Sequence, residues 1–182
     1  MLLGTELHGK VFGVVGMGRI GAATARRARG FGMTIRYFNR REAAPELVAE
    51  LGAERRDLDA LIAESDVLSL HCPLNDASRH LLDARQFARM KPTAILINTA
   101  RGPVVDEAAL VEALQAGQIA GAGLDVYEDE PAVHPGLLER DDVMLLPHLG
   151  SATRETRAVM AKLALDNCLE VLAGRPALTP IG

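Results

Sequence analysis

The sequence predicts an α/β fold, in which a doubly wound parallel sheet is covered by helices on both faces, in three layers. Six short apolar runs rich in Val, Ile and Leu alternate with longer stretches of helical periodicity. The runs are nearly continuous, as strands covered on both faces require, and the helices between them supply that cover. The expected strands are Val11–Val15, Thr34–Phe38, Asp66–Leu70, Ala94–Thr99, Gly121–Val126 and Val143–Leu146.

Two helices and two breaks are marked clearly in the second half of the chain. Asp106 precedes an apolar set spaced as on one helix face, and Gly117 ends that set. A second helix is expected from about Arg154 to Ala173, with its apolar side against the sheet. Pro131–Gly136 and Arg175–Gly182 contain the prolines and glycines of a loop and a tail. We therefore expect one domain over residues 1–182, with 175–182 as its tail.

Composition excludes several classes of partner. The chain has 20 Lys and Arg against 24 Asp and Glu, a formal net charge of -4, so no basic field favours nucleic acid or anionic lipid. Cys72 and Cys168 are far apart and form neither a disulfide framework nor a metal-ligand spacing. No apolar run suits a signal peptide or approaches the roughly 18 residues of a membrane span. We expect a cytoplasmic protein that binds a small molecule, with no metal, nucleic acid or membrane partner.

A glycine-rich turn follows the first expected strand. Residues 10–21 read KVFGVVGMGRIG, so the strand runs into Gly16-x-Gly18-x-x-Gly21 and then into a helical stretch. The first glycine allows a tight turn, the second lets a pyrophosphate approach the backbone, and the third lets helix and strand pack closely. The helix N-terminus adds oriented N–H donors for the phosphates. With strand, turn, helix and second strand in order, the motif predicts a Rossmann-type dinucleotide site rather than a mere glycine turn.

The end of the second expected strand bears on which dinucleotide is bound. Asn39 lies 18 residues after Gly21, where an NAD enzyme usually has an acid. A carboxylate there binds the ribose 2′-hydroxyl and repels a 2′-phosphate, whereas Asn39 followed by Arg40 and Arg41 would accept the phosphate. The pattern therefore favours NADP. The alternative is that both arginines are solvated charges at a strand end and that the cofactor is NAD.

Polar residues also follow three later strands. Arg101, Asp125, Glu130 and His148 lie in segments that come directly after expected strands. The carboxyl ends of parallel strands line one crevice, so these side chains are expected to converge there. An arginine, a carboxylate and a histidine form a coherent set for reducing a 2-oxo acid. Taken singly, each also has an ordinary explanation, as a surface arginine, a solvated acid or a packed histidine.

Other candidate residues have open interpretations. His71, Cys72 and Pro73 end a strand near the expected adenosine side, where a cofactor contact and a buried structural thiol are equally good explanations. His80 and His134 lie in polar or loop surroundings and are expected to be exposed, while His8 lies near the start of the chain. The sequence assigns no partner to any of these three histidines.

Four motifs together carry a family resemblance. They are the glycine fingerprint at Gly16, Gly18 and Gly21, a TARG-type segment at Thr99–Gly102, a glycine-leucine-aspartate-valine strand at Gly123–Val126, and a proline-histidine segment at Pro147–His148. With them the chain resembles, nearly end to end, the nucleotide-binding part of the D-2-hydroxyacid dehydrogenase family. The resemblance implies that Arg101, Glu130 and His148 are the catalytic trio. The residues expected to contact the cofactor are Gly16, Gly18, Arg19, Ile20, Gly21, Asn39, Arg40, Arg41, Cys72, Pro73, Thr99, Ala100, Arg101, Asp125, His148 and Gly150.

The resemblance also implies a reaction. In the family the nicotinamide exchanges a hydride with C2 of a small 2-oxo or 2-hydroxy acid. His148 would protonate the substrate oxygen, Glu130 would hold the other ring nitrogen, and Arg101 would bind the substrate carboxylate. With the arginines after Asn39, this predicts an NADP-preferring oxidoreductase acting on glyoxylate or hydroxypyruvate. Family members usually dimerise through this domain, so a homodimer is expected.

Other functions remain open. In the family a further N-terminal segment of about a hundred residues forms most of the substrate-binding domain. We expect that segment to be absent here, so that the chain alone binds cofactor but turns over substrate poorly. An NAD-dependent phosphoglycerate or D-lactate dehydrogenase is disfavoured by Asn39, and a formate dehydrogenase usually has glutamine in place of Glu130. A non-catalytic dinucleotide-sensing module stays possible, whereas a methyltransferase would leave the trio unexplained.

Overall fold

The computed structural model describes residues 4–180 of the chain. These residues belong to two compact units, one extending to Pro147 and the other beginning at His148.

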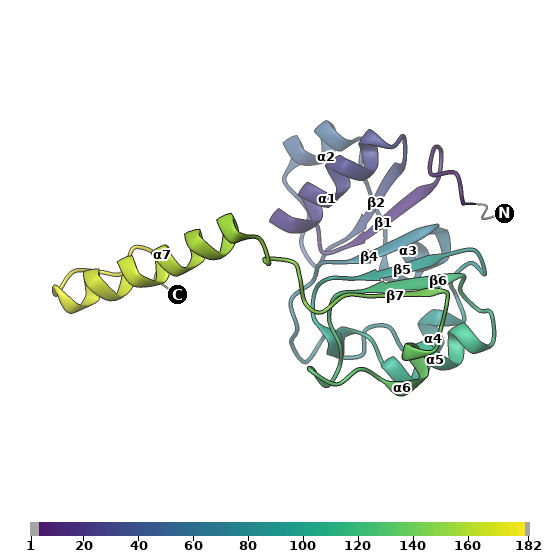
Figure 1. The fold of residues 1–182 in the computed structure, drawn as a ribbon. Coiled ribbons are helices and arrows are strands. Elements are labelled where there is room, and N and C mark those ends of the chain that lie inside the picture. The colour runs from purple at the N-terminus through teal and green to yellow at the C-terminus, as the bar shows by residue number, and fades with distance from the viewer. Residues whose placement is uncertain (1–3, 181–182) are drawn as a thin grey trace. The chain divides into compact units, whose positions relative to one another are not determined.

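The first unit is built on a parallel sheet of seven strands (Figure 1). The strands lie in the order β3-β2-β1-β4-β5-β6-β7, so β1 pairs with both β2 and β4. The chain therefore reverses its winding direction beside β1, and ligands of open α/β sheets bind at such a switch point. The strand bounds are β1 (Val11–Val15), β2 (Thr34–Phe38), β3 (Glu54–Arg55), β4 (Val67–Leu70), β5 (Ile95–Asn98), β6 (Gly121–Leu124) and β7 (Val143–Leu145).

Helices cover both faces of this sheet. Figure 1 shows α1 and α2 on one side and α4, α5 and α6 on the other. On the first face Val14 and Ile35 pack with side chains of α1 and α2, and on the second face Val15, Leu70 and Leu96 pack with α3 and α5. The helices are α1 (Arg19–Gly30), α2 (Pro45–Leu51), α3 (Leu58–Glu64), α4 (Ala84–Phe87), α5 (Glu107–Gln115) and α6 (Pro135–Leu138), with a 3-10 turn at Gly102–Val104. The three-layer, doubly wound fold expected from the sequence is confirmed.

Two local features differ from the expectation. The sequence does not predict the edge strand β3, because Glu54–Arg55 is only two residues long, polar and exposed. Helix α6 begins at Pro135, within the segment expected to be a loop. Proline is favourable in the first turn of a helix, and the His134 ring accepts a hydrogen bond from the N–H of Gly136 at 3.1 Å.

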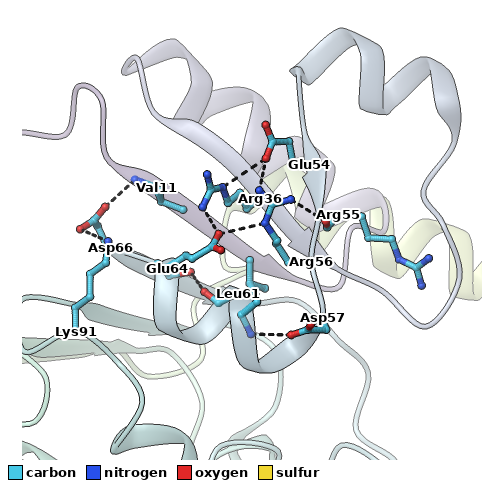
Figure 2. Close-up of polar contacts among 12 residues, drawn as sticks. Val11, Arg36, Glu54, Arg55, Arg56, Asp57, Leu61, Glu64, Asp66 and Lys91 are labelled. Atoms are coloured by element: carbon cyan, nitrogen blue, oxygen red, sulfur yellow. Dashed lines mark hydrogen bonds and ion pairs between the residues drawn. The ribbon is translucent and has the colours of Figure 1, made fainter.

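An ionic cluster holds β3 against the rest of the unit (Figure 2). Arg36 of β2 contacts the carboxylate of Glu64 and lies 3.8 Å from that of Glu54. Arg56, which follows β3, contacts Glu54 and lies 3.2 Å from Glu64. Each of these two arginines interacts with both carboxylates. The short edge strand is therefore held by ion pairs as well as by its two residue pairs with β2.

The second unit consists of helix α7 (Arg154–Leu172) and the segment after it. Thr153 caps the helix by accepting a hydrogen bond from the N–H of Thr156 at 3.1 Å. The tail folds back on α7, since the N–H of Thr179 donates to Oδ1 of Asn167 at 3.0 Å. The contact of α7 with the sheet, expected from the sequence, involves both units and stays a prediction. Within residues 4–180 no helix is both long and apolar enough to cross a membrane.

Candidate dinucleotide-binding site

The three glycines of the turn after β1 have different surroundings. Gly16 has a φ of +100°, and a Cβ there would lie 2.7 Å from the carbonyl carbon of His71. A Cβ at Gly21 would collide with the carbonyl oxygen of Gly16, whereas a Cβ at Gly18 would meet nothing within 4 Å. The fold therefore requires glycine at the first and third positions. The second leaves an open surface that a phosphate group can approach.

Helix α1 begins directly at this open surface. Gly18 is its N-cap residue, no side chain caps the helix, and its first turn carries no acid. The first N–H groups of a helix have no partner within it, and they attract anions together with the helix dipole. The start of α1 therefore fits a pyrophosphate.

The end of β2 is tied to the glycine turn. Oδ1 of Asn39 accepts a hydrogen bond from the N–H of Met17 at 2.7 Å, and the N–H of Gly16 donates to the carbonyl of Phe38 at 3.0 Å. Asn39 thus fixes the turn, a role that the sequence does not reveal. It does so without placing a carboxylate at the end of the strand.

A cavity of about 970 Å³ opens beside this turn. This volume suits a small organic ligand or cofactor. Of the residues expected to contact the cofactor, the cavity is lined by Gly16, Gly18, Asn39, Arg40, Arg41, Cys72 and Pro73. A neighbouring hollow of about 630 Å³ includes Arg19 and Ile20 in its lining. His71, which precedes Cys72 at the end of β4, lines the larger cavity too, and so do Asn75 and Ser78, which the sequence does not single out.

Arg55 of β3 organises the loop that carries Arg40 and Arg41. Its guanidinium donates to the carbonyl oxygens of Asn39 at 3.0 Å and of Arg40 at 3.5 Å, and lies 3.5 Å from Oε1 of Glu42. Figure 2 shows the Arg55 side chain pointing away from the ionic cluster of Arg36 and Arg56. Arg40 and Arg41 are exposed at the cavity. The loop is therefore held through its backbone, while both arginine side chains can reach a ligand.

The segment after β4 forms another wall of the cavity. Burial raises the pKa of the Cys72 thiol, so Cys72 stays protonated and is a poor nucleophile. Burial lowers the pKa of the His71 imidazole, whose Nε2 lies 2.9 Å from Oγ of Ser69. Both side chains are therefore neutral at pH 7. They suit an apolar part of a ligand better than a charged one.

The turn that carries Arg101 is shaped by Asn98, at the buried end of β5. The Asn98 side chain accepts from the N–H of Ala100 and donates to the carbonyl of Arg101, both at 3.1 Å. Arg101 itself is exposed. Neither cavity described above is lined by four of the residues expected at the cofactor, which are Thr99, Ala100, Arg101 and Asp125. Asp125 is buried, and its N–H donates to the carbonyl of Asn98 at 3.0 Å.

The loop after β6 places Glu130 beside the turn of Arg101. Oε1 of Glu130 accepts from the N–H of Tyr127 at 3.1 Å, and the Tyr127 hydroxyl donates to the carbonyl of Leu146 at 2.8 Å. A Cβ at Gly102 would collide with the backbone of Tyr127, so the two segments pack backbone to backbone. The structure thus brings together the segments of Arg101 and Glu130.

His148 and Gly150 belong to the second unit. His148 is exposed and has a φ of +55°, a conformation uncommon for a residue other than glycine. The convergence of His148 with Arg101 and Glu130 stays a prediction.

A buried carboxylate underlies the Glu130 loop. Burial raises the pKa of Glu107, and the charge of Glu128 adds to this effect. The two residues are paired reciprocally: Oε1 of Glu107 accepts from the N–H of Glu128 at 2.6 Å, and Oε2 of Glu128 accepts from the N–H of Glu107 at 3.3 Å. The pair fastens the loop to the start of α5.

Glu107→Gln is expected to reduce the dependence of stability on pH. Because the native pKa lies above the ordinary value of 4.5, the native state binds more protons than the unfolded state between these two values. The wild type should therefore lose stability relative to the variant as pH rises through that window, because the variant's amide does not titrate and its oxygen can still accept from the N–H of Glu128. Urea unfolding from about pH 4 to about pH 7.5 measures this. A variant that is as pH-dependent as the wild type over this range contradicts it.

The parallel order around β1, the glycine turn, and the uncapped start of α1 define a dinucleotide-binding α/β protein of the Rossmann class. Residues 1–150 match the family model described as "D-isomer specific 2-hydroxyacid dehydrogenase, NAD binding domain". The chain belongs to this family and carries its NAD-binding domain.

Three similar proteins illustrate the match. The glyoxylate reductase of Thermococcus litoralis is 50% identical over 174 residues, which are 96% of this chain and 52% of that protein. The crystal structure of a glyoxylate reductase from Paecilomyes thermophila has a TM-score of 0.91 and 47% identity, covering 98% of this chain and 54% of that one. An NADPH-dependent glyoxylate/hydroxypyruvate reductase from Sinorhizobium meliloti, solved with NADP and malonate, has a TM-score of 0.89 and 40% identity, covering 96% and 53%. The chain thus spans about half the length of these relatives.

Proposed function

We propose that this chain is the NADP(H)-binding part of a reductase that acts on a small 2-oxo acid such as glyoxylate or hydroxypyruvate. The observation that carries the cofactor preference is the end of β2. There Oδ1 of Asn39 accepts a hydrogen bond from the backbone N–H of Met17, so the side chain is occupied within the protein. Arg40 and Arg41, by contrast, are exposed at the cavity. Two guanidinium groups suit a 2′-phosphate, which a carboxylate at this strand end would repel. The Sinorhizobium meliloti relative, whose structure holds NADP, supports this choice.

One carboxylate does line the cavity near these arginines. Glu42 is largely exposed, and its Oε1 lies 3.5 Å from the Arg55 guanidinium. That guanidinium offsets the Glu42 charge and holds the backbone on which Arg40 lies. Arg55 therefore supports Arg40 and Arg41, the two residues proposed to bind the 2′-phosphate, without lining the cavity itself. The open surface at Gly18 and the first N–H groups of α1 would receive the pyrophosphate.

The catalytic roles follow from side-chain chemistry and family membership. When bound, the nicotinamide supplies or accepts the hydride at C2 of the substrate. Arg101 would bind the substrate carboxylate and polarise the carbonyl, a charge-assisted contact with a geometry that lysine cannot copy. One ring nitrogen of His148 would donate a proton to the substrate oxygen. The Glu130 carboxylate would accept a hydrogen bond from the other ring nitrogen of His148. The activity of the whole protein, its cytoplasmic location and a homodimeric state are part of this proposal.

Calorimetric titration with NADPH and NADH tests the cofactor preference on the chain itself. We expect NADPH to bind at least about tenfold more tightly, or about 1.4 kcal/mol, and Arg40→Asp to abolish that difference. Arg85→Asp, an exposed position on α4 outside the cavity, is the matched control and should leave the difference unchanged. If NADH binds more tightly, Arg40 and Arg41 are solvated charges and an NAD-dependent D-lactate or phosphoglycerate dehydrogenase becomes the better hypothesis. If neither binds, the proposal fails.

A further inference from the structure

His80 lies where the segments of Arg101 and Glu130 meet. The backbone N–H of His80 donates to the carbonyl of Pro103 at 2.8 Å, and Pro103 lies two residues beyond Arg101. Its Nε2 contacts Oε1 of Glu128, two residues before Glu130. One residue from the β4–α4 connection is therefore bonded through its backbone to one segment and through its side chain to the other.

The backbone of His80 is held in an uncommon conformation. Its φ is +48°, and within residues 4–180 only His148 shares a positive φ among residues other than glycine. Such a conformation costs free energy for a residue with a Cβ and persists only where the surroundings impose it. Its neighbour Leu82 pairs with the same segment, because the N–H of Leu82 donates to the carbonyl of Val104 at 3.2 Å. The backbone pairing thus aims the His80 ring at Glu128.

Carboxylates surround the His80 ring. Glu128 contacts Nε2, and Oδ2 of Asp106 lies 4.0 Å from Nδ1. The buried carboxylate of Glu107 lies next to Glu128 and accepts a hydrogen bond from the backbone N–H of Glu128. Glu107 also lies close to His134. An N–H donor that binds Glu128 reduces repulsion among these acids and limits the positions that the Glu130 loop can take.

We propose that His80 is a positioning residue that links the Arg101 segment to the Glu130 loop and so fixes the distance between these two side chains. The inference rests on the proposed roles of Arg101 and Glu130 in binding substrate and holding the catalytic histidine. Nothing in the sequence connects His80 to Glu128, because 48 residues separate them. The chain topology alone brings them into contact.

Amide hydrogen exchange in two His80 variants tests the link. His80→Asn tolerates the positive φ but is too short to reach Glu128, whereas His80→Gln keeps an N–H donor near the position of Nε2. We expect His80→Asn to raise the exchange rate of the Tyr127 and Glu128 amides by about tenfold or more, without changing that of Val14 in β1. His80→Gln should keep both amides within about threefold of the wild type. His8→Asn, at an exposed histidine near the start of the chain, should change neither.

Each contrary outcome identifies its cause. Unchanged exchange at Tyr127 and Glu128 in His80→Asn overturns the proposal, as does an equal rise at Val14, which would indicate a general loss of stability. If His80→Asn does not fold, His80→Gly, which adopts the positive φ without strain and has no side chain to reach Glu128, must give the same local rise at Tyr127, and a stable Tyr127 amide there also overturns the proposal. NADPH affinity should stay within about threefold in the His80 variants, because His80 does not line the cavity. Failure of the wild type to bind NADPH would refute the proposed function and leave the exchange result standing.

Discussion

Gly21→Ala is expected to lower the free energy of unfolding by about 3 kcal/mol, whereas Gly18→Ala should change it by less than about 0.5 kcal/mol. The methyl group added at Gly21 would collide with the carbonyl oxygen of Gly16, which cannot move without disrupting the turn after β1. At Gly18 the space is open and φ is -84°, which alanine adopts freely. Urea unfolding of both variants against the wild type measures the difference.

The two variants should also separate folding from binding. Gly18→Ala should lower NADPH affinity by at least about tenfold, because the new methyl group occupies the surface that the pyrophosphate needs. Calorimetry on this folded variant provides the check. Unchanged NADPH affinity would show that the pyrophosphate does not approach Gly18. A Gly21→Ala chain as stable as the wild type would mean that the close contact with Gly16 is not required.

The sheet could be predicted because its signals are local. A strand buried on both faces is a continuous apolar run, and all six expected strands are present with ends within two residues of the prediction. The glycine turn could be predicted for the same reason, since each glycine meets a need of the backbone around it. Asp106 is an equally local signal, and it caps α5 as expected.

What the sequence could not reveal depends on contacts between distant residues. Arg55 bonds to the carbonyls of Asn39 and Arg40 only because β3 pairs with β2, and a strand of two polar residues leaves no periodic signal. The polar surroundings of His80 in the sequence predict an exposed side chain. In the structure it contacts Glu128, because the connection after β4 and the loop after β6 lie side by side.

Gly102→Ala is expected to have the largest effect on stability, a loss of about 4 kcal/mol. A Cβ at this position would overlap the carbonyl group of Tyr127 and approach the N–H of Glu128, and both are backbone atoms that cannot rotate away. To make room, the turn of Arg101 and the loop of Glu130 must separate. Urea unfolding measures the loss in stability, and the exchange rate of the Tyr127 amide reports the local separation where the variant still folds.

Gly30→Ala is the matched control for this loss. Gly30 is the last residue of α1, its φ is not positive, and a Cβ there would meet nothing within 4 Å. Alanine also restricts the unfolded chain more than glycine does, so this variant should be as stable as the wild type or slightly more stable. If Gly102→Ala proves equally harmless, the two segments are not packed backbone to backbone. The positions of Arg101 and Glu130 would then have to be fixed by side chains such as His80 and Glu128 alone.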